Sequence, residues 1–127
     1  MELVAALFVE HIDFRQIEGG STRIDLTGAF FSQPVASFPV TLTPHLVALV
    51  RAPADDSGQA TFVTEFFRNG EQVARIVQPV QVEPGKFGYR LVRPELTFDE
   101  AGTVEAHCTI VEGGSTIVVP LTVVPHA

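Results

Sequence analysis

Two pairs of side chains have the residue types and the spacing that a metal site or an acid–base site requires. His11 and Asp13 are two residues apart, and so are Glu105 and His107. Residues i and i+2 of a β-strand point to the same side, so each pair would present one imidazole and one carboxylate together. These groups are metal ligands and general acids or bases. If the two strands were neighbours, the four side chains could form a metal-dependent or hydrolytic active site.

Ordinary solvated strand faces carry such pairs too, and no well-defined catalytic motif accompanies them here. The chain has no Gly-x-Ser-x-Gly elbow, no phosphate-binding Gly-x-x-x-x-Gly-Lys and no His-Glu-x-x-His. Ser21 and Ser115 each follow Gly-Gly, which is typical of turns. Asp55-Asp56-Ser57 lacks the spaced carboxylates and closing Glu of a calcium loop. We therefore expect no catalysis, no cofactor and no metal, and we keep the His/Asp/Glu enzyme as the alternative.

Composition and charge limit the partners. The chain has 127 residues with 8 basic and 15 acidic side chains, which give a formal net charge of -7. This charge repels phosphate backbones and anionic lipid, so we expect neither nucleic acid nor a membrane as partner. No apolar run approaches the roughly 20 residues of a membrane-spanning helix, and no basic segment precedes the first apolar run as in a signal peptide. The expected location is the cytoplasm.

Turn residues at regular intervals predict an all-β fold. Asn69-Gly70 separates two strand-like segments, Gln59 to Arg68 and Glu71 to Gln78, and Asn-Gly accepts the positive φ angles of a tight hairpin turn. Other Gly-Gly and Pro-Gly turns separate further short apolar or alternating segments. This spacing and the chain length predict a single domain over residues 1–127, an antiparallel two-sheet sandwich of about eight strands.

Two registers are open for the Asn69-Gly70 hairpin. A two-residue turn pairs Phe62 with Val77, whereas a bulged three-residue loop pairs Phe62 near Ile76. Phe62 faces the core in either register. The difference is whether Val77 or Ile76 lies beside it.

Alternation of apolar and polar residues predicts the buried side of each strand. The single Cys108 lies on such a buried side, so we interpret it as a small hydrophobe and not as a nucleophile. The single Tyr89 also falls on a predicted core side and there is no Trp, so a sugar-stacking surface is not expected. The expected core residues are Leu26, Phe30, Leu46, Phe62, Phe66, Phe87, Leu91, Val104, Cys108 and Leu121.

The first apolar segment, Leu3 to Val9, is apolar at odd and at even positions, so both sides of this strand are apolar. A two-layer sandwich covers only one side of a strand with its own second sheet, so the other side needs a different cover. We expect a symmetric homodimer through a sheet face or edge that includes this first strand, with another protein as the other possible partner. The connection Gln33 to Pro39 could supply the cover within one chain instead.

One segment near the C-terminus resembles a known pattern. Phe98 to Cys108 reads Phe-Asp-Glu-Ala-Gly-Thr-Val-Glu-Ala-His-Cys, which resembles the Asp-x-Gly-x-Tyr-x-Cys approach to a late strand of immunoglobulin-like domains. Val104 stands where that pattern has Tyr, and Ala106 stands where it has Cys. The resemblance implies an immunoglobulin-like sandwich.

The order of sequence motifs along the whole chain is similar to that in a group of small uncharacterised bacterial β-sandwich domains. The cues are a first apolar strand that ends at Asp13, a Gly-Gly turn into Ile24 to Phe30, an Arg-Asn-Gly-Glu hairpin and a final Gly-x-Val strand pair. That family has no established activity, so the resemblance implies a fold and no site residues. We expect a non-catalytic interaction or structural module.

Overall fold

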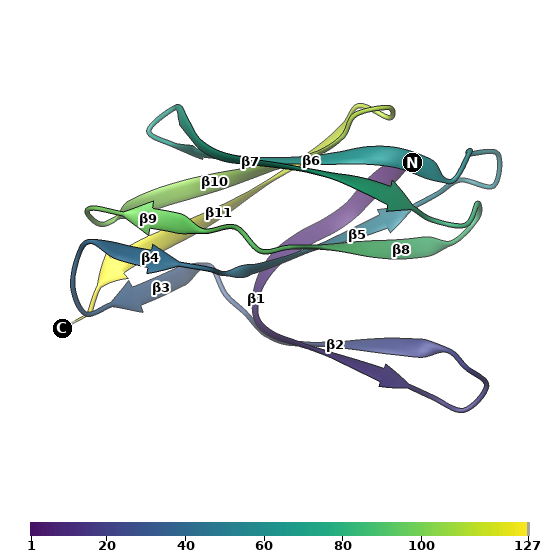
Figure 1. The fold of residues 1–127 in the computed structure, drawn as a ribbon, viewed down its shortest axis with the longest axis horizontal. Helices are drawn as coiled ribbons and strands as arrows, with labels where there is room; N and C mark the ends of the chain where they lie inside the picture. The colour runs from purple at the N-terminus through teal and green to yellow at the C-terminus, as the bar shows by residue number, and fades with distance from the viewer. Residues whose placement is uncertain (127) are drawn as a thin grey trace.

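The computed structural model describes residues 1–126, which form eleven strands and no helix (Figure 1). No helix in this range is therefore available to cross a membrane. In chain order the strands are β1 (Glu2–Gln16), β2 (Thr22–Ala29), β3 (Ser32–Val35), β4 (Val40–Leu42), β5 (His45–Arg51), β6 (Gln59–Arg68), β7 (Glu71–Gln81), β8 (Phe87–Val92), β9 (Leu96–Phe98), β10 (Gly102–Ile110) and β11 (Ser115–Pro125).

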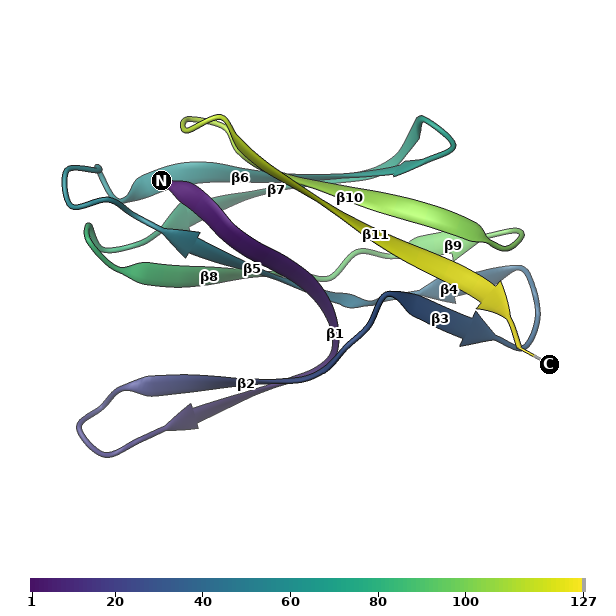
Figure 2. The same cartoon turned by 180° about the vertical axis from the view of Figure 1, so that it is seen from behind.

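Two larger sheets face each other in a sandwich-like arrangement, as Figures 1 and 2 show. The four-stranded sheet has the order β2-β1-β5-β8, and the five-stranded sheet has the order β3-β11-β10-β6-β7. All neighbours are antiparallel except β3 and β11, and β4 and β9 form a separate two-stranded sheet. The predicted all-β sandwich is confirmed. The strands outnumber the expected eight, and three of them, β3, β4 and β9, are only three or four residues long; most of β3 lies in the segment Gln33 to Pro39, which we interpreted as a connection.

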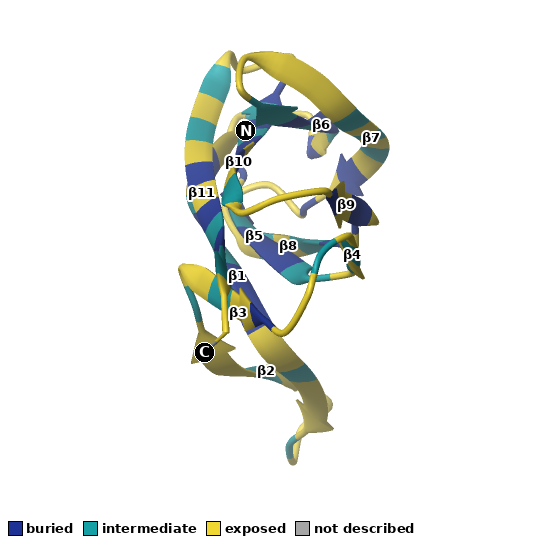
Figure 3. Cartoon of the chain, turned by 90° about the vertical axis from the view of Figure 1, so that its left-hand side faces the viewer, coloured by how far each residue is buried: buried dark blue, intermediate teal, exposed yellow. Residues whose placement is uncertain are grey.

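The hydrophobic core fills the space between the two larger sheets, and buried and exposed residues alternate along β10 and β11 (Figure 3). The prediction is correct for most of the core, and Phe30 is half-buried against it. Burying these side chains removes apolar surface from water, which is the main favourable contribution to folding. The predicted core residues that are fully buried are Leu46, Phe62, Phe66, Val104, Cys108 and Leu121.

The predicted core side of β8 is wrong. Phe87 and Tyr89 point outward and are 67% and 39% exposed, and Leu91 on the same side is half-buried. Gly88 and Arg90 take the inward side instead. Alternation identifies the two sides of a strand but does not say which side the opposite sheet covers.

Close packing explains why a glycine occupies the inner side of β8. A Cβ atom at position 88 would lie 2.6 Å from Cγ2 of the buried Val82. Gly88 pairs with Val50, whose side chain belongs to the core. The approach of Val82 therefore requires the absence of a side chain at this position, and the aromatic residues face outward as a result.

Leu26 is also not a core residue. It lies on β2 and is 39% exposed. β2 pairs with the second half of β1 only, and this hairpin leaves the sandwich instead of packing inside it (Figures 1 and 2). The period-two pattern of β2 is thus real, but it belongs to a projecting hairpin.

The hairpin at Asn69-Gly70 adopts neither of the two expected registers. Asn69 and Gly70 have φ angles of 52° and 79°, as a two-residue turn requires. The register then shifts between Phe66 and Phe67, so Phe62 pairs with Gln78. The extra residue is in β7 and not in the loop, and it brings Ile76 to the core side while Val77 remains 50% exposed.

Most of the first apolar segment is covered within the chain. Leu3, Ala6 and Phe8 belong to the core, and Val9 is buried as well. This half of β1 pairs with β5 and also lies beside β11. In the segment 33–39, the strand β3 pairs with β11, and Val35 packs in the core cluster that also contains Phe8.

Candidate functional site

The four side chains of the predicted metal or acid–base site form two separate pairs. Nε2 of His11 lies 3.0 Å from Oδ1 of Asp13, and Nε2 of His107 lies 3.5 Å from Oε1 of Glu105. Each predicted pair therefore shares a strand face. However, the first pair lies on the projecting part of β1, whereas the second lies on β10 in the middle of the other sheet. Residues 1–126 contain no group of three or more potential metal ligands.

His107 packs against an aromatic side chain. The ring centroids of His107 and Phe67 are 4.7 Å apart, and Phe67 lies on the neighbouring strand β6. Glu105 is directly opposite Phe67 in the register. These contacts fit a packed outer sheet face, so the structure does not bring the four residues together as the enzyme alternative required.

Cys108 is not accessible for nucleophilic chemistry. It is fully buried in the core, and burial raises the pKa of its thiol to about 12. The thiolate, which is the reactive form, is therefore strongly disfavoured. The predicted role of Cys108 as a small buried hydrophobe is confirmed.

The hairpin formed by residues 10–29, which we call the arm, projects from the four-stranded sheet (Figures 1 and 2). One of its faces is charged: the Arg15 guanidinium pairs with Asp25 through a 3.0 Å bond from Nη2 to Oδ1 and a second bond from Nε. This hydrogen-bonded pair holds the pKa of the Asp25 carboxyl below its ordinary value. The other face is apolar and consists of Ile12, Phe14, Ile24 and Leu26.

The apolar face of the arm meets the outward aromatic residues of β8. Phe14 is 51% exposed, and its ring centroid lies 5.8 Å from that of Tyr89. The exposed Phe87 lies two residues away on the same side of β8. Tyr89 is therefore a surface residue, contrary to our prediction, and this surface does offer aromatic rings. Exposed apolar patches of this kind mark interaction surfaces.

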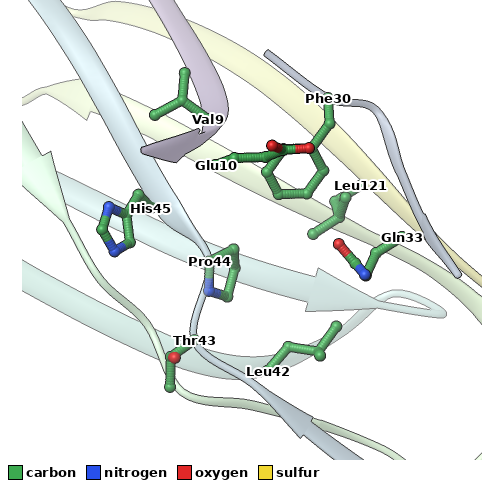
Figure 4. A pocket seen from close by; sticks show the side chains of 9 residues that line it. All are labelled: Val9, Glu10, Phe30, Gln33, Leu42, Thr43, Pro44, His45 and Leu121. Carbon is green, nitrogen blue, oxygen red and sulfur yellow. The ribbon is translucent and has the colours of Figure 1, made fainter. Parts of the chain in front are cut away.

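A cavity of about 310 Å³ lies at the base of the arm (Figure 4). Its polar groups include the Glu10 carboxylate, the His45 imidazole and the Gln33 amide. In Figure 4 the Glu10 carboxylate lies beside the Phe30 ring, and His45 lies on the opposite side of the cavity. The complete lining is Val9, Glu10, Phe30, Gln33, Leu42, Thr43, Pro44, His45 and Leu121.

The volume of this cavity at the base of the arm is at the lower end of the range for ligand pockets, which is roughly 300 to 1,000 Å³. No hydrogen bond joins Glu10 to His45 within residues 1–126, so the two groups do not form an oriented acid–base pair. Sequence reasoning missed this cavity because its residues come from β1, β3, β4, β5 and β11 and their connections, and no local motif links them.

Comparison with known proteins does not supply a function. Neither the protein-family models nor the curated proteins contain a match to this chain. The geometry of the molecule is therefore the basis for inferring its function.

Proposed function

We propose that this protein is a non-catalytic interaction module that forms a symmetric homodimer through the free edge of β2. The observation that carries the proposal is the projecting arm. The arm has an unpaired edge strand, and the charges along that strand are self-complementary. The proposed interface differs from the expected one: most of the segment Leu3 to Val9 is covered within the chain, and β1 contributes its second half, as the other strand of the arm.

The edge of β2 can accept another strand. β2 is the last strand of its sheet and pairs only with β1. Its residues are mostly exposed, and none of its eight residues is a proline, which would remove a backbone donor. Unpaired N–H and C=O groups on such an edge are a template for strand addition.

The sequence of β2 fits an antiparallel copy of itself. Arg23 and Asp25 flank Ile24. When two β2 strands pair about a two-fold axis through Ile24, Arg23 of each copy lies opposite Asp25 of the other. A directly opposed pair of opposite charges contributes roughly 0.2 to 1 kcal/mol. A two-fold interface uses every such contact twice, so the arrangement is favourable although each chain has a net charge of -7.

The apolar face of the arm supports the same arrangement. Phe14 and Ile24 are paired across the arm, as are Ile12 and Leu26. Two paired arms would form a four-stranded ribbon with these side chains on one face. The exposed apolar area of two arms would then lie in one continuous surface instead of two separate ones.

We also propose an immunoglobulin-like topology and a cytoplasmic location. The order β7-β6-β10-β11 corresponds to strands C′, C, F and G of that fold, and β1-β5-β8 corresponds to A, B and E. The parallel contact of β3 with β11 adds a strand at the G edge. The single cysteine, buried and free, is compatible with a reducing compartment.

The dimer is tested by the mass of the protein in solution. Light scattering coupled to size exclusion should give twice the chain mass at high micromolar concentration and a decrease on dilution. Arg23→Asp places two carboxylates opposite each other at both ends of the contact, so this variant should be monomeric. Arg93→Asp, which makes the same change at an exposed residue outside the arm, should remain dimeric.

Charge exchange provides the specific control. The Arg23→Asp chain and the Asp25→Arg chain each oppose like charges in a homodimer, but a mixture of the two opposes unlike charges at both positions. The mixture should therefore form a heterodimer. A wild-type protein that is monomeric at high micromolar concentration would reject the proposal, and so would a mixture that fails to associate while the wild type dimerises.

A further inference from the structure

The cavity at the base of the arm presents hydrogen-bond acceptors that the chain does not use. Within residues 1–126, the Glu10 carboxylate takes part in no hydrogen bond and in no ion pair. The side-chain amide of Gln33 donates from Nε2 to the carbonyl oxygen of Pro34 at 3.1 Å, so its Oε1 atom remains to accept a bond from elsewhere. In Figure 4 this oxygen lies on the side of Gln33 that is nearer to Glu10 and Phe30. The cavity therefore lacks a donor.

The backbone of β2 places the Glu10 carboxylate at the cavity wall. Gly28 on β2 has a φ angle of 68°, and a Cβ atom at this position would lie 2.7 Å from Cδ and 2.8 Å from Oε2 of Glu10. The carboxyl group thus lies directly against the neighbouring strand, where only a glycine leaves room for it. An exposed carboxylate is usually surrounded by solvent, whereas this one has a defined position beside the cavity.

An aromatic ring borders the carboxylate. Phe30 is half-buried, and its ring centroid lies 6.2 Å from that of the fully buried Phe8, so the ring is anchored to the core. In Figure 4 the Glu10 carboxylate lies beside the Phe30 ring. A cation within about 6 Å of a ring centroid is attracted by the π-electrons. A positive group bound to Glu10 would therefore also lie close to an aromatic ring.

The cavity is open to solvent and contains no competing basic side chain. Glu10 and Thr43 are exposed, and Phe30, Gln33 and Leu42 are half-buried, so a ligand can reach them. The lining includes neither lysine nor arginine. The net charge of -7 also favours the approach of a cation over that of an anion.

We infer that this cavity binds a small primary ammonium ion with a short hydrocarbon chain. An ammonium group has three N–H donors, which match the acceptors of Glu10, Gln33 and Thr43. The bond to the Glu10 carboxylate is charge-assisted and thus of the stronger kind. Phe30 and Leu42 provide apolar contacts for the hydrocarbon chain. Binding at this cavity does not depend on the proposed dimer, whose contact is centred at Ile24.

Butylammonium is the probe, and the readout is the Gln33 side-chain amide and the Gly28 backbone amide in ¹H–¹⁵N NMR spectra. At constant ionic strength, butylammonium should shift both resonances in a saturable way, whereas butyrate, butanol and sodium chloride should not. Butyltrimethylammonium has the same charge but no N–H donor, so it should bind several-fold more weakly.

Three variants locate the bound cation. Glu10→Gln should weaken the binding of butylammonium by about tenfold, because a hydrogen bond to a charged group contributes roughly 1.5 kcal/mol or more. Phe30→Leu keeps an apolar side chain but removes the ring, so it should weaken binding by about 2- to 5-fold. Glu18→Gln makes the same charge change as Glu10→Gln at an exposed glutamate of the arm outside the cavity, and its affinity should equal that of the wild type.

Unchanged Gln33 and Gly28 resonances in the wild type would overturn the inference, and so would equal affinities of the wild type and Glu10→Gln. Equal losses of affinity in Glu10→Gln and Glu18→Gln would indicate a general response to net charge and would overturn it as well. Equal affinities for butylammonium and butyltrimethylammonium would overturn the assignment to primary ammonium ions.

Discussion

At the scale of single residues, two phenylalanines with similar sequence patterns have opposite environments. Phe66 and Phe87 both lie in alternating segments, and both were predicted to be buried. Phe66 is fully buried between the sheets, whereas Phe87 is exposed on the outer side of β8. The hydrophobic contribution of a side chain depends on the area that folding removes from water, so these two rings differ in their effect on stability.

Phe66→Ala should therefore lower the free energy of unfolding by about 3 to 5 kcal/mol, the usual range for removing a buried Phe ring. Phe87→Ala should change it by less than about 0.5 kcal/mol, as is typical of surface substitutions. Chemical denaturation of both variants measures the difference. Equal losses of stability would contradict the outward position of Phe87.

At the scale of elements, two loops with the same residues have different roles. Glu18-Gly19-Gly20-Ser21-Thr22 joins β1 to β2, and Glu112-Gly113-Gly114-Ser115-Thr116 joins β10 to β11. The Glu112 carboxylate accepts hydrogen bonds from the backbone N–H and the hydroxyl of Thr61, both at 2.8 Å. These bonds anchor the second loop to β6, while Glu18 is exposed on the arm and makes no such bond within residues 1–126.

The hydrogen bonds between Glu112 and Thr61 should make the folded protein less stable at acid pH. The hydrogen bonds from Thr61 hold the pKa of the Glu112 carboxyl below its ordinary value. Its contribution is thus fully present above the unfolded-state pKa of about 4.3 and is lost as the pH falls through the lower folded-state pKa. Glu112→Gln should reduce the decline of the melting temperature below about pH 5, whereas Glu18→Gln should leave that decline unchanged. Identical pH profiles for wild type and Glu112→Gln would contradict this role.

At the scale of the whole molecule, the two histidine–carboxylate pairs are separated by the architecture. His11 and Asp13 lie on the arm, and Glu105 and His107 lie in the five-stranded sheet. Each pair offers two ligands at most, and a structural metal site generally needs four. Folding should thus be independent of metal.

Chelation tests this expectation. A divalent-metal chelator should leave the melting temperature unchanged, because no metal-binding energy is coupled to folding. A drop that one added divalent ion reverses would contradict it and assign His11 or His107 as a ligand. The double variant His11→Ala and His107→Ala would then remove the effect of that ion.

The sequence by itself determined the class of fold and much of the core. Gly-rich turns and the Asn69-Gly70 dipeptide impose positive φ angles locally, and alternation along β10 and β11 separates a buried side from an outer side. The inert, buried Cys108 follows from the same alternation. Both signals depend on neighbouring residues, so they can be detected without knowledge of the sheet order.

Tertiary structure alone decided which side of β8 faces inward, the register of the β6–β7 hairpin and the departure of the arm from the sandwich. The contact of Val82 at Gly88 places Arg90 inside and the aromatic residues outside. An extra residue in β7 pairs Phe62 with Gln78 and places Ile76, instead of Val77, on the inner side of β7. The proposed dimer interface depends on the departure of the arm from the sandwich. A period of two defines two sides of a strand, but only the packing of distant segments determines which side becomes core and which becomes surface.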